Sequence, residues 1–140
     1  MYRQLFCGVA LMLLLTSCSR AGSAEELLDR LQGDWKFESL VIDGTTAPDD
    51  LVSKMSLSIK GDQMVPTDSP NDKAAIKLDA SANPIGIDLK GAKQHDIGIV
   101  RLEGDKLTLC LAAKGKARPS TFEASKGSQA QLWVLKRSVK

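Results

Sequence analysis

The spacing of turn-forming residues is the feature that most constrains how this chain can fold. After Gly33 the sequence breaks into short apolar runs, separated every few residues by Gly, Pro, Asp or Asn. The run from Met55 to Lys60 alternates Met55, Leu57 and Ile59 with polar residues, which predicts a half-buried strand. Such short connections join antiparallel neighbours, because parallel strands need long crossovers. We therefore expect an all-β fold, an antiparallel up-and-down β-barrel of about eight strands.

The expected strands are runs of apolar and β-branched residues that end at turn residues. They are 35–42, 55–60, 63–65, 74–78, 85–89, 97–102, 106–112, 121–124 and 132–136. The segments 97–102 and 106–112 form the clearest hairpin, joined through Glu103-Gly104-Asp105. In the first strand, alternation predicts that Trp35, Phe37, Ser39 and Val41 share one face.

Two helical segments are expected, both short. Ser23 is a suitable N-cap, and Glu26, three residues later, completes a capping box. Leu27, Leu28 and Leu31 give the first helix its apolar face, and Gly33 ends it. A single helical turn is expected at 50–54.

The N-terminus has the composition of a secretory signal peptide. Arg3 precedes an apolar segment, 5–15, whose eleven residues would span only about 16 Å as a helix, roughly half of a bilayer core. Leu15-Thr16-Ser17-Cys18 then resembles the lipobox of bacterial lipoproteins. The resemblance implies cleavage before Cys18, a diacylglyceryl group on its sulfur and a further acyl chain, such as palmitate, on its amine. An ordinary signal peptide with an incidental cysteine is the alternative.

These features predict three segments: a signal peptide at 1–17, a lipidated cysteine and tether at 18–23, and a β-barrel domain at 24–140. The expected location is the cell envelope, on a membrane held through lipid on Cys18 and facing the periplasm or the exterior. Ser19 follows the cysteine in place of Asp, which by the sorting pattern of such lipoproteins permits export to the outer membrane. A tether of residues 19–22 reaches about 14 Å, so the domain would lie close to the membrane.

Composition excludes several classes of function. Without Arg3, 18 basic and 17 acidic side chains remain, a net charge of about +1 that argues against nucleic-acid binding. Basic residues gather at 114–118 and 136–140, either as solvated surface or as contacts to anionic lipid. Cys7 leaves with the signal peptide, so Cys110 becomes the one free thiol, expected as a small buried side chain.

No set of residues with the pattern of a catalytic site is visible. His95, the one histidine, lies beside turn residues and is expected to be exposed, and no Gly-x-Ser-x-Gly motif is present. Carboxylates at 49–50 and 68–72 lack the spacing of a calcium loop and are expected to be solvated turn residues. We therefore expect no enzymatic activity, no cofactor and no metal site.

Two motifs near opposite ends of the expected barrel domain's sequence resemble lipocalins. Gly33-Asp34-Trp35 is similar to their Gly-x-Trp motif, and Arg137 ends the last strand. The resemblance implies that Arg137 stacks on Trp35 and closes the barrel, a cation–π contact of about 0.5–2 kcal/mol.

The mature chain is also similar to a lipocalin-like family of small domains, abundant in planctomycetes and without an established activity. The matching stretches are Leu31-Gln32-Gly33-Asp34-Trp35, Asp43-Gly44, Ile59-Lys60-Gly61-Asp62, Ile87-Asp88-Leu89, Gly98-Ile99, Leu102-Glu103-Gly104-Asp105-Lys106-Leu107, Leu109-Cys110, Arg118-Pro119, Phe122 and Leu135-Lys136-Arg137. Val100 replaces an aromatic residue of the family pattern, and 66–73 lacks its glycine-bearing lead-in.

Two functions fit this sequence. The first is binding of a small apolar ligand inside the barrel, for which the candidate lining residues are Phe37, Met55, Leu57, Ile59, Ile87, Leu107 and Leu109. The second is a barrel with a filled core that acts through its surface as an interaction or inhibitor module for an envelope protein. Arg118 is a candidate rim residue, either as an anchor for a ligand carboxylate or phosphate or as a packed loop residue. A cavity of about 300 Å³ or more would favour the first function over the second.

Overall fold

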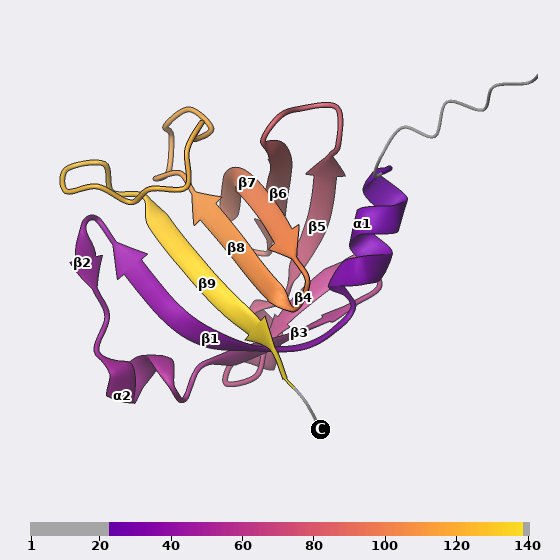
Figure 1. Cartoon of the computed structure of the whole chain (residues 1–140), viewed down its shortest axis with the longest axis horizontal. Coiled ribbons are helices and arrows are strands. Elements are labelled where there is room, and N and C mark those ends of the chain that lie inside the picture. The colour runs from indigo at the N-terminus through magenta and orange to yellow at the C-terminus, as the bar shows by residue number, and fades with distance from the viewer. Residues whose placement is uncertain (1–22, 139–140) are drawn as a thin grey trace, which may run out of the picture.

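A computed structural model describes residues 23–138 of the chain. They form a closed antiparallel barrel of eight strands with one short N-terminal helix at its side (Figure 1). The predicted fold class is therefore confirmed. Within the described residues, no helix combines the length and apolar character needed to cross a membrane.

The strands follow one another around the barrel in chain order. They are β1 (Gly33–Ile42), β3 (Ser56–Lys60), β4 (Gln63–Pro66), β5 (Ala74–Asp79), β6 (Ile85–Gly91), β7 (His95–Glu103), β8 (Lys106–Leu111) and β9 (Gln131–Arg137). β9 pairs with β1 and closes the barrel, while β2 (Thr45–Thr46) pairs only with the last two residues of β1. The helical elements are α1 (Ala24–Leu31), α2 (Asp49–Val52) and the 3-10 turn η1 (Pro70–Asp72). The expected helical turn near residue 50 and the hairpin of β7 and β8 are both present.

α1 begins at the N-cap that the sequence predicts, Ser23. The Ser23 side chain accepts a hydrogen bond from the backbone N–H of Glu26 at 3.1 Å. This contact satisfies one of the amide groups that the first turn leaves without an intrahelical partner. Leu27 and Leu31 are buried against the barrel, which holds the helix at its side.

A bulge in β1 makes one expectation about this strand wrong. Its pairing with β9 shifts between Phe37 and Ser39, so that Leu40, and not Ser39 or Val41, continues the inward face. The extra residue reverses the alternation beyond it, because successive side chains of a strand point to opposite faces. The inward face therefore runs through Trp35, Phe37 and Leu40, all of them buried.

The expected strand at 121–124 is also wrong. These residues belong to a long loop, 112–130, that joins β8 to β9 across the outer surface of the barrel. β8 already pairs with β7 and β9, so a closed barrel leaves no free edge beside it for another strand. Beneath the loop, Ile99 and Cys110 on the outer face are buried together with Ala124 and Ala130. The barrel thus has a main interior core and a smaller apolar cluster outside it.

Backbone pairing in the barrel is shortest on both sides of the β3–β4 hairpin. β1 pairs with β3 only over Gly33–Lys36, and β4 pairs with β5 only at Gln63 and Met64. Beyond these pairs the strands separate, and α2 and the segment 67–73 lie at this part of the wall. A hollow can form there because the neighbouring strands do not continue.

Candidate functional site

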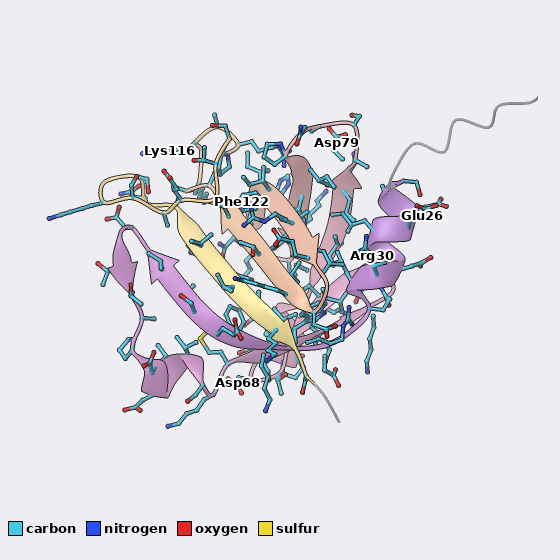
Figure 2. The ribbon with its side chains drawn as sticks, viewed as in Figure 1. Glu26, Arg30, Asp68, Asp79, Lys116 and Phe122 are labelled. Carbon is cyan, nitrogen blue, oxygen red and sulfur yellow. The ribbon has the colours of Figure 1, made fainter. Side chains whose placement is uncertain are left out.

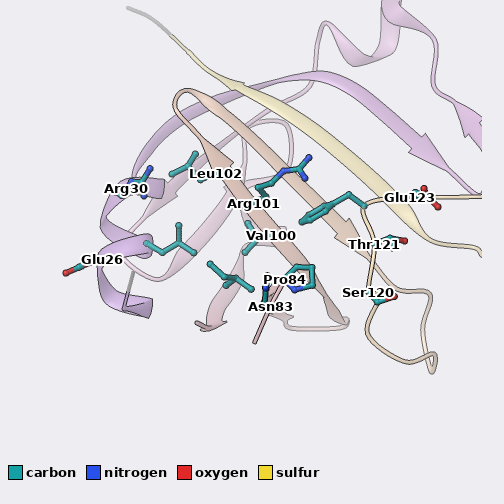
Figure 3. Close-up of a pocket in the computed structure, with 13 residues that line it drawn as sticks. Glu26, Arg30, Asn83, Pro84, Val100, Arg101, Leu102, Ser120, Thr121 and Glu123 are labelled. Atoms are coloured by element: carbon teal, nitrogen blue, oxygen red, sulfur yellow. The ribbon is translucent and has the colours of Figure 1, made fainter. Parts of the chain in front are cut away.

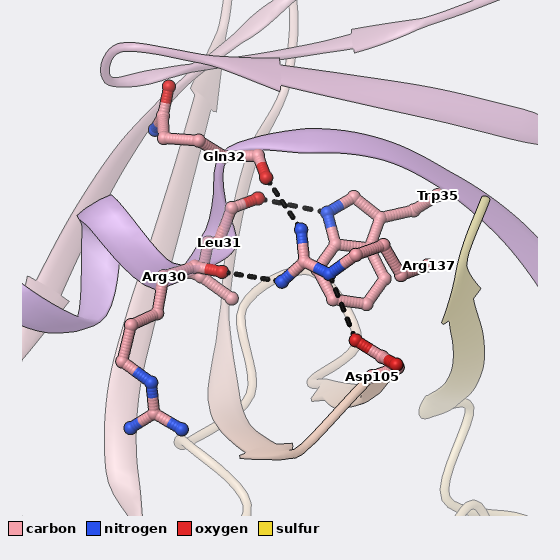
Figure 4. A network of polar contacts seen from close by, with 6 residues as sticks. All are labelled: Arg30, Leu31, Gln32, Trp35, Asp105 and Arg137. Carbon is pink, nitrogen blue, oxygen red and sulfur yellow. Dashed lines mark hydrogen bonds and ion pairs between the residues drawn. The ribbon is translucent and has the colours of Figure 1, made fainter. Parts of the chain in front are cut away.

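The end of the barrel beside α1 is closed by Arg137 and Trp35. The Arg137 guanidinium carbon lies 4.4 Å from the centre of the Trp35 ring, so the expected stack is present (Figure 4). The guanidinium also donates to the carbonyl oxygens of Arg30 and Gln32, each at 2.7 Å, and pairs with Asp105 at 3.2 Å. Gly33 lies against this group with a φ of 122°, a backbone conformation that residues other than glycine rarely adopt.

This network also completes the C-terminus of α1. The last four carbonyl groups of a helix have no intrahelical partner. Here the carbonyl of Leu28 accepts from the Gln32 side chain, that of Asp29 from the Gln32 backbone, that of Arg30 from Arg137, and that of Leu31 from Trp35 Nε1. All four are satisfied, and the positive guanidinium lies where the helix dipole is negative. The closed end is therefore occupied by the protein's own side chains.

A pocket of about 310 Å³, partly open to solvent and named the interior cavity below, lies farther along the same strands. Its walls come from β1, β3, β4, β9 and the segment 67–73, in the part of the barrel where backbone pairing is shortest. The lining residues are mostly apolar: Phe37, Leu40, Met55, Ser56, Leu57, Met64, Pro66, Asp68, Ser69, Gln131 and Trp133. The Phe37 and Trp133 rings meet with centres 5.3 Å apart at a tilt of 57°. This arrangement is suited to holding a small molecule whose body is apolar.

The structure separates the predicted cavity residues into two groups. Phe37, Met55 and Leu57 line the interior cavity. Ile59, Ile87, Leu107 and Leu109 are buried in the main core and do not line it, since they lie where the barrel is filled.

Leu40, Met64 and Trp133 line the cavity, although sequence analysis did not select them. Leu40 was missed because of the β1 bulge. Alternation along β4 and β9 carries the signal that points to Met64 and Trp133.

An outer groove of about 850 Å³ crosses the barrel wall between α1 and the 112–130 loop (Figure 3). Apolar residues such as Leu27, Pro84 and Val100 line it together with charged residues of both signs. The complete lining is Glu26, Leu27, Arg30, Asn83, Pro84, Ile85, Val100, Arg101, Leu102, Ser120, Thr121, Phe122 and Glu123. Arg101 stacks on Phe122, 4.4 Å from the ring centre, and pairs with Glu103 at 2.7 Å.

Arg118 attaches the 112–130 loop to the sheet. Its guanidinium donates to the carbonyl oxygens of Ile87 at 3.1 Å and Gly98 at 2.7 Å, and pairs with Asp88 at 2.7 Å. Of the two roles considered for Arg118, these contacts favour the packed loop residue. They join β6, β7 and the loop on the outer face, and Arg118 lines neither the interior cavity nor the outer groove.

The remaining chemistry-bearing residues do not converge on a common site. Cys110 is buried and donates to the carbonyl of Glu123 at 3.4 Å, and burial raises the pKa of its thiol. The hydrogen bond from Ser81 lowers the pKa of the exposed Asp79. His95 is exposed, as expected, at the start of β7. Within residues 23–138 no three His, Cys, Asp or Glu side chains are grouped as metal ligands.

The expected signal peptide at 1–17, the expected lipidation site Cys18 and nearly all of the expected tether fall outside the described residues. In comparisons with known proteins, no family model, no curated protein and no solved structure matches this chain.

Proposed function

We propose that this protein is a binding protein that holds a small apolar molecule in the interior cavity. The observation that carries the proposal is the partly open cavity of about 310 Å³, with mostly apolar and aromatic walls, in a closed barrel. Its volume is at the lower end of those that hold small molecules. Phe37, Leu57 and Met64 are each less than a tenth exposed, so the part of a guest that contacts them would be withdrawn from water. Transfer of apolar surface out of water supplies the binding free energy.

A neutral fluorescent probe, N-phenyl-1-naphthylamine, tests this proposal with the purified protein in detergent-free buffer. We expect saturable binding with one site per chain. Met55→Trp fills part of the cavity and should weaken binding about tenfold or more. Leu51→Trp adds the same ring to a residue that is 54% exposed on α2 and does not line the cavity, so it should leave affinity unchanged. Circular dichroism of both variants checks that they are folded. Absence of saturable binding, or equal binding by folded Met55→Trp, would overturn the proposal.

We also propose that the protein acts at a membrane of the cell envelope, held by lipid on Cys18. The support is the sequence 15–18, which resembles a lipobox, and its position after an apolar segment of eleven residues. Metabolic labelling with an alkyne analogue of palmitate, in a bacterium that processes lipoproteins, tests the anchor. We expect label and membrane association in the native protein and in Cys110→Ser, and loss of both in Cys18→Ser. Label that persists in Cys18→Ser would refute the assignment.

The outer groove supports a second candidate function, contact with another envelope protein. Arg30 lines the groove from α1, and no residue within 23–138 forms a hydrogen bond or ion pair with its guanidinium. Such an exposed cation beside apolar surface is suited to an acidic partner. A photocrosslinking amino acid at Thr121 should then give a discrete adduct in cells. Arg30→Glu should reduce the yield of this adduct, and the same probe at Ser81 should give none. Equal adducts from both positions would argue against this function.

A further inference from the structure

The interior cavity carries charge of only one sign. Among its lining residues Asp68 is the only charged one, and no Lys, Arg or His lines the cavity (Figure 2 shows Asp68). No described residue donates a hydrogen bond to the Asp68 carboxylate or forms an ion pair with it. A guest that carries a carboxylate would meet this negative charge without any compensating cation. A guest that carries a cation would find a partner.

The lining of the hollow beside η1 also carries more negative than positive charge. This second hollow, of about 460 Å³, adjoins η1 and the turn between β6 and β7. Its lining includes Asp72, Asp96 and a single cation, Lys93. This second hollow therefore has no excess of positive charge that would attract an anionic ligand.

The aromatic residues of the cavity favour a cation as well. Trp133 Nε1 donates to Gln131 Oε1 at 2.9 Å, which fixes the indole against the Phe37 ring. The faces of both rings carry negative electrostatic potential, and a cation near such a face is stabilised. The polarisable thioethers of Met55 and Met64 complete an apolar wall that adapts to the shape of a guest.

We propose that the ligand of the interior cavity is a hydrophobic amine, with an apolar body inside the barrel and a protonated amino group recognised by Asp68 and the aromatic pair. This inference rests on the proposed binding function and specifies the class of ligand. A matching guest has one cationic group and an aromatic or aliphatic body small enough for about 310 Å³.

Three ligands with the same naphthalene body test the inference by calorimetry: 2-(2-naphthyl)ethylamine, 2-ethylnaphthalene and 2-naphthylacetic acid. We expect the amine to bind about tenfold tighter than the neutral compound, from an exposed ion pair and a cation–π contact, and the acid to bind most weakly. Asp68→Asn should reduce the preference for the amine to about threefold. Asp50→Asn, a matched change on α2 that does not line the cavity, should leave the preference intact. Added salt should weaken binding of the amine more than binding of the neutral compound.

The outcomes distinguish the two proposals. If none of the three compounds binds, the proposed binding function itself fails. If all three bind equally, or the acid binds tightest, the cavity binds apolar molecules but the inference of an amine is overturned. A preference for the amine that Asp68→Asn leaves unchanged would also overturn it, because the recognition would not involve the carboxylate.

Discussion

Replacing Arg137 by Met tests whether the closed end of the barrel depends on one guanidinium. The change removes two hydrogen bonds from a charged donor to the carbonyls of Arg30 and Gln32, together with the stack on Trp35. Hydrogen bonds of this kind contribute about 1.5–3 kcal/mol each, and a partly exposed cation–π contact about 0.5–1 kcal/mol. The Arg137 side chain is 30% exposed, so the lower values apply. The exposed pair with Asp105 adds little.

We therefore expect Arg137→Met to lower the free energy of unfolding by about 3–4 kcal/mol. The thioether still covers the Trp35 ring, so most of the loss reflects the polar contacts. For a domain of this size, such a loss lowers the melting temperature by roughly 10–20 °C. Urea unfolding followed by tryptophan fluorescence measures it, because Trp35 is fully buried beneath the replaced group.

Arg30→Met is the matched control for this variant. It makes the same substitution on α1, where the guanidinium has no hydrogen bond or ion pair within residues 23–138, and should cost less than about 0.5 kcal/mol. A loss below about 1 kcal/mol in Arg137→Met, or one equal to that of Arg30→Met, would refute the reasoning. It would mean that water replaces the guanidinium at the α1 carbonyls without penalty.

Three further measurements probe other parts of the barrel. A Cβ added at Gly98 would lie 2.1 Å from the carbonyl oxygen of Cys110. Gly98→Ala should therefore lower the free energy of unfolding by about 3 kcal/mol or more. An unchanged midpoint of urea unfolding would contradict this close approach. The Cys110 thiol should react with an aromatic disulfide reagent at pH 8 far more slowly in the native than in the unfolded protein. Because the pKa of Cys110 is raised in the folded protein, its contribution to the free energy of unfolding is fully present below the unfolded pKa. This contribution declines as the pH rises through the unfolded pKa toward the folded pKa, and Cys110→Ala should remove the decline. The pKa of Asp79 is lowered, so its contribution to stability is present above its unfolded pKa and is lost as pH falls toward the folded pKa. Ser81→Ala should raise that pKa in an NMR titration, and an unmoved titration would exclude the hydrogen bond as the cause.

Local patterns in the sequence predict much of the barrel because their causes are local. The N-cap Ser23 orders the start of α1, and Glu103-Gly104-Asp105 allows the tight turn between β7 and β8. Period-two alternation places Leu57 and Ile59 inside. The pair of Trp35 and Arg137 could be anticipated only from resemblance, since 102 positions separate its members.

Only the tertiary structure decided where the barrel is filled and where it is hollow. The β1 bulge turns Leu40 inward because the two halves of β1 pair with β9 in shifted registers. Alternation along β1 alone does not reveal this shift. Arg118 contacts carbonyls on two strands because closure of the barrel places them beneath the 112–130 loop. The cavity lies beside β3 and β4 because these strands are short and their neighbours diverge. The sequence by itself thus determined the class of fold, since strands and turns depend on near neighbours. The site depends on which distant strands pair and where their pairing stops, and that is a property of the closed barrel.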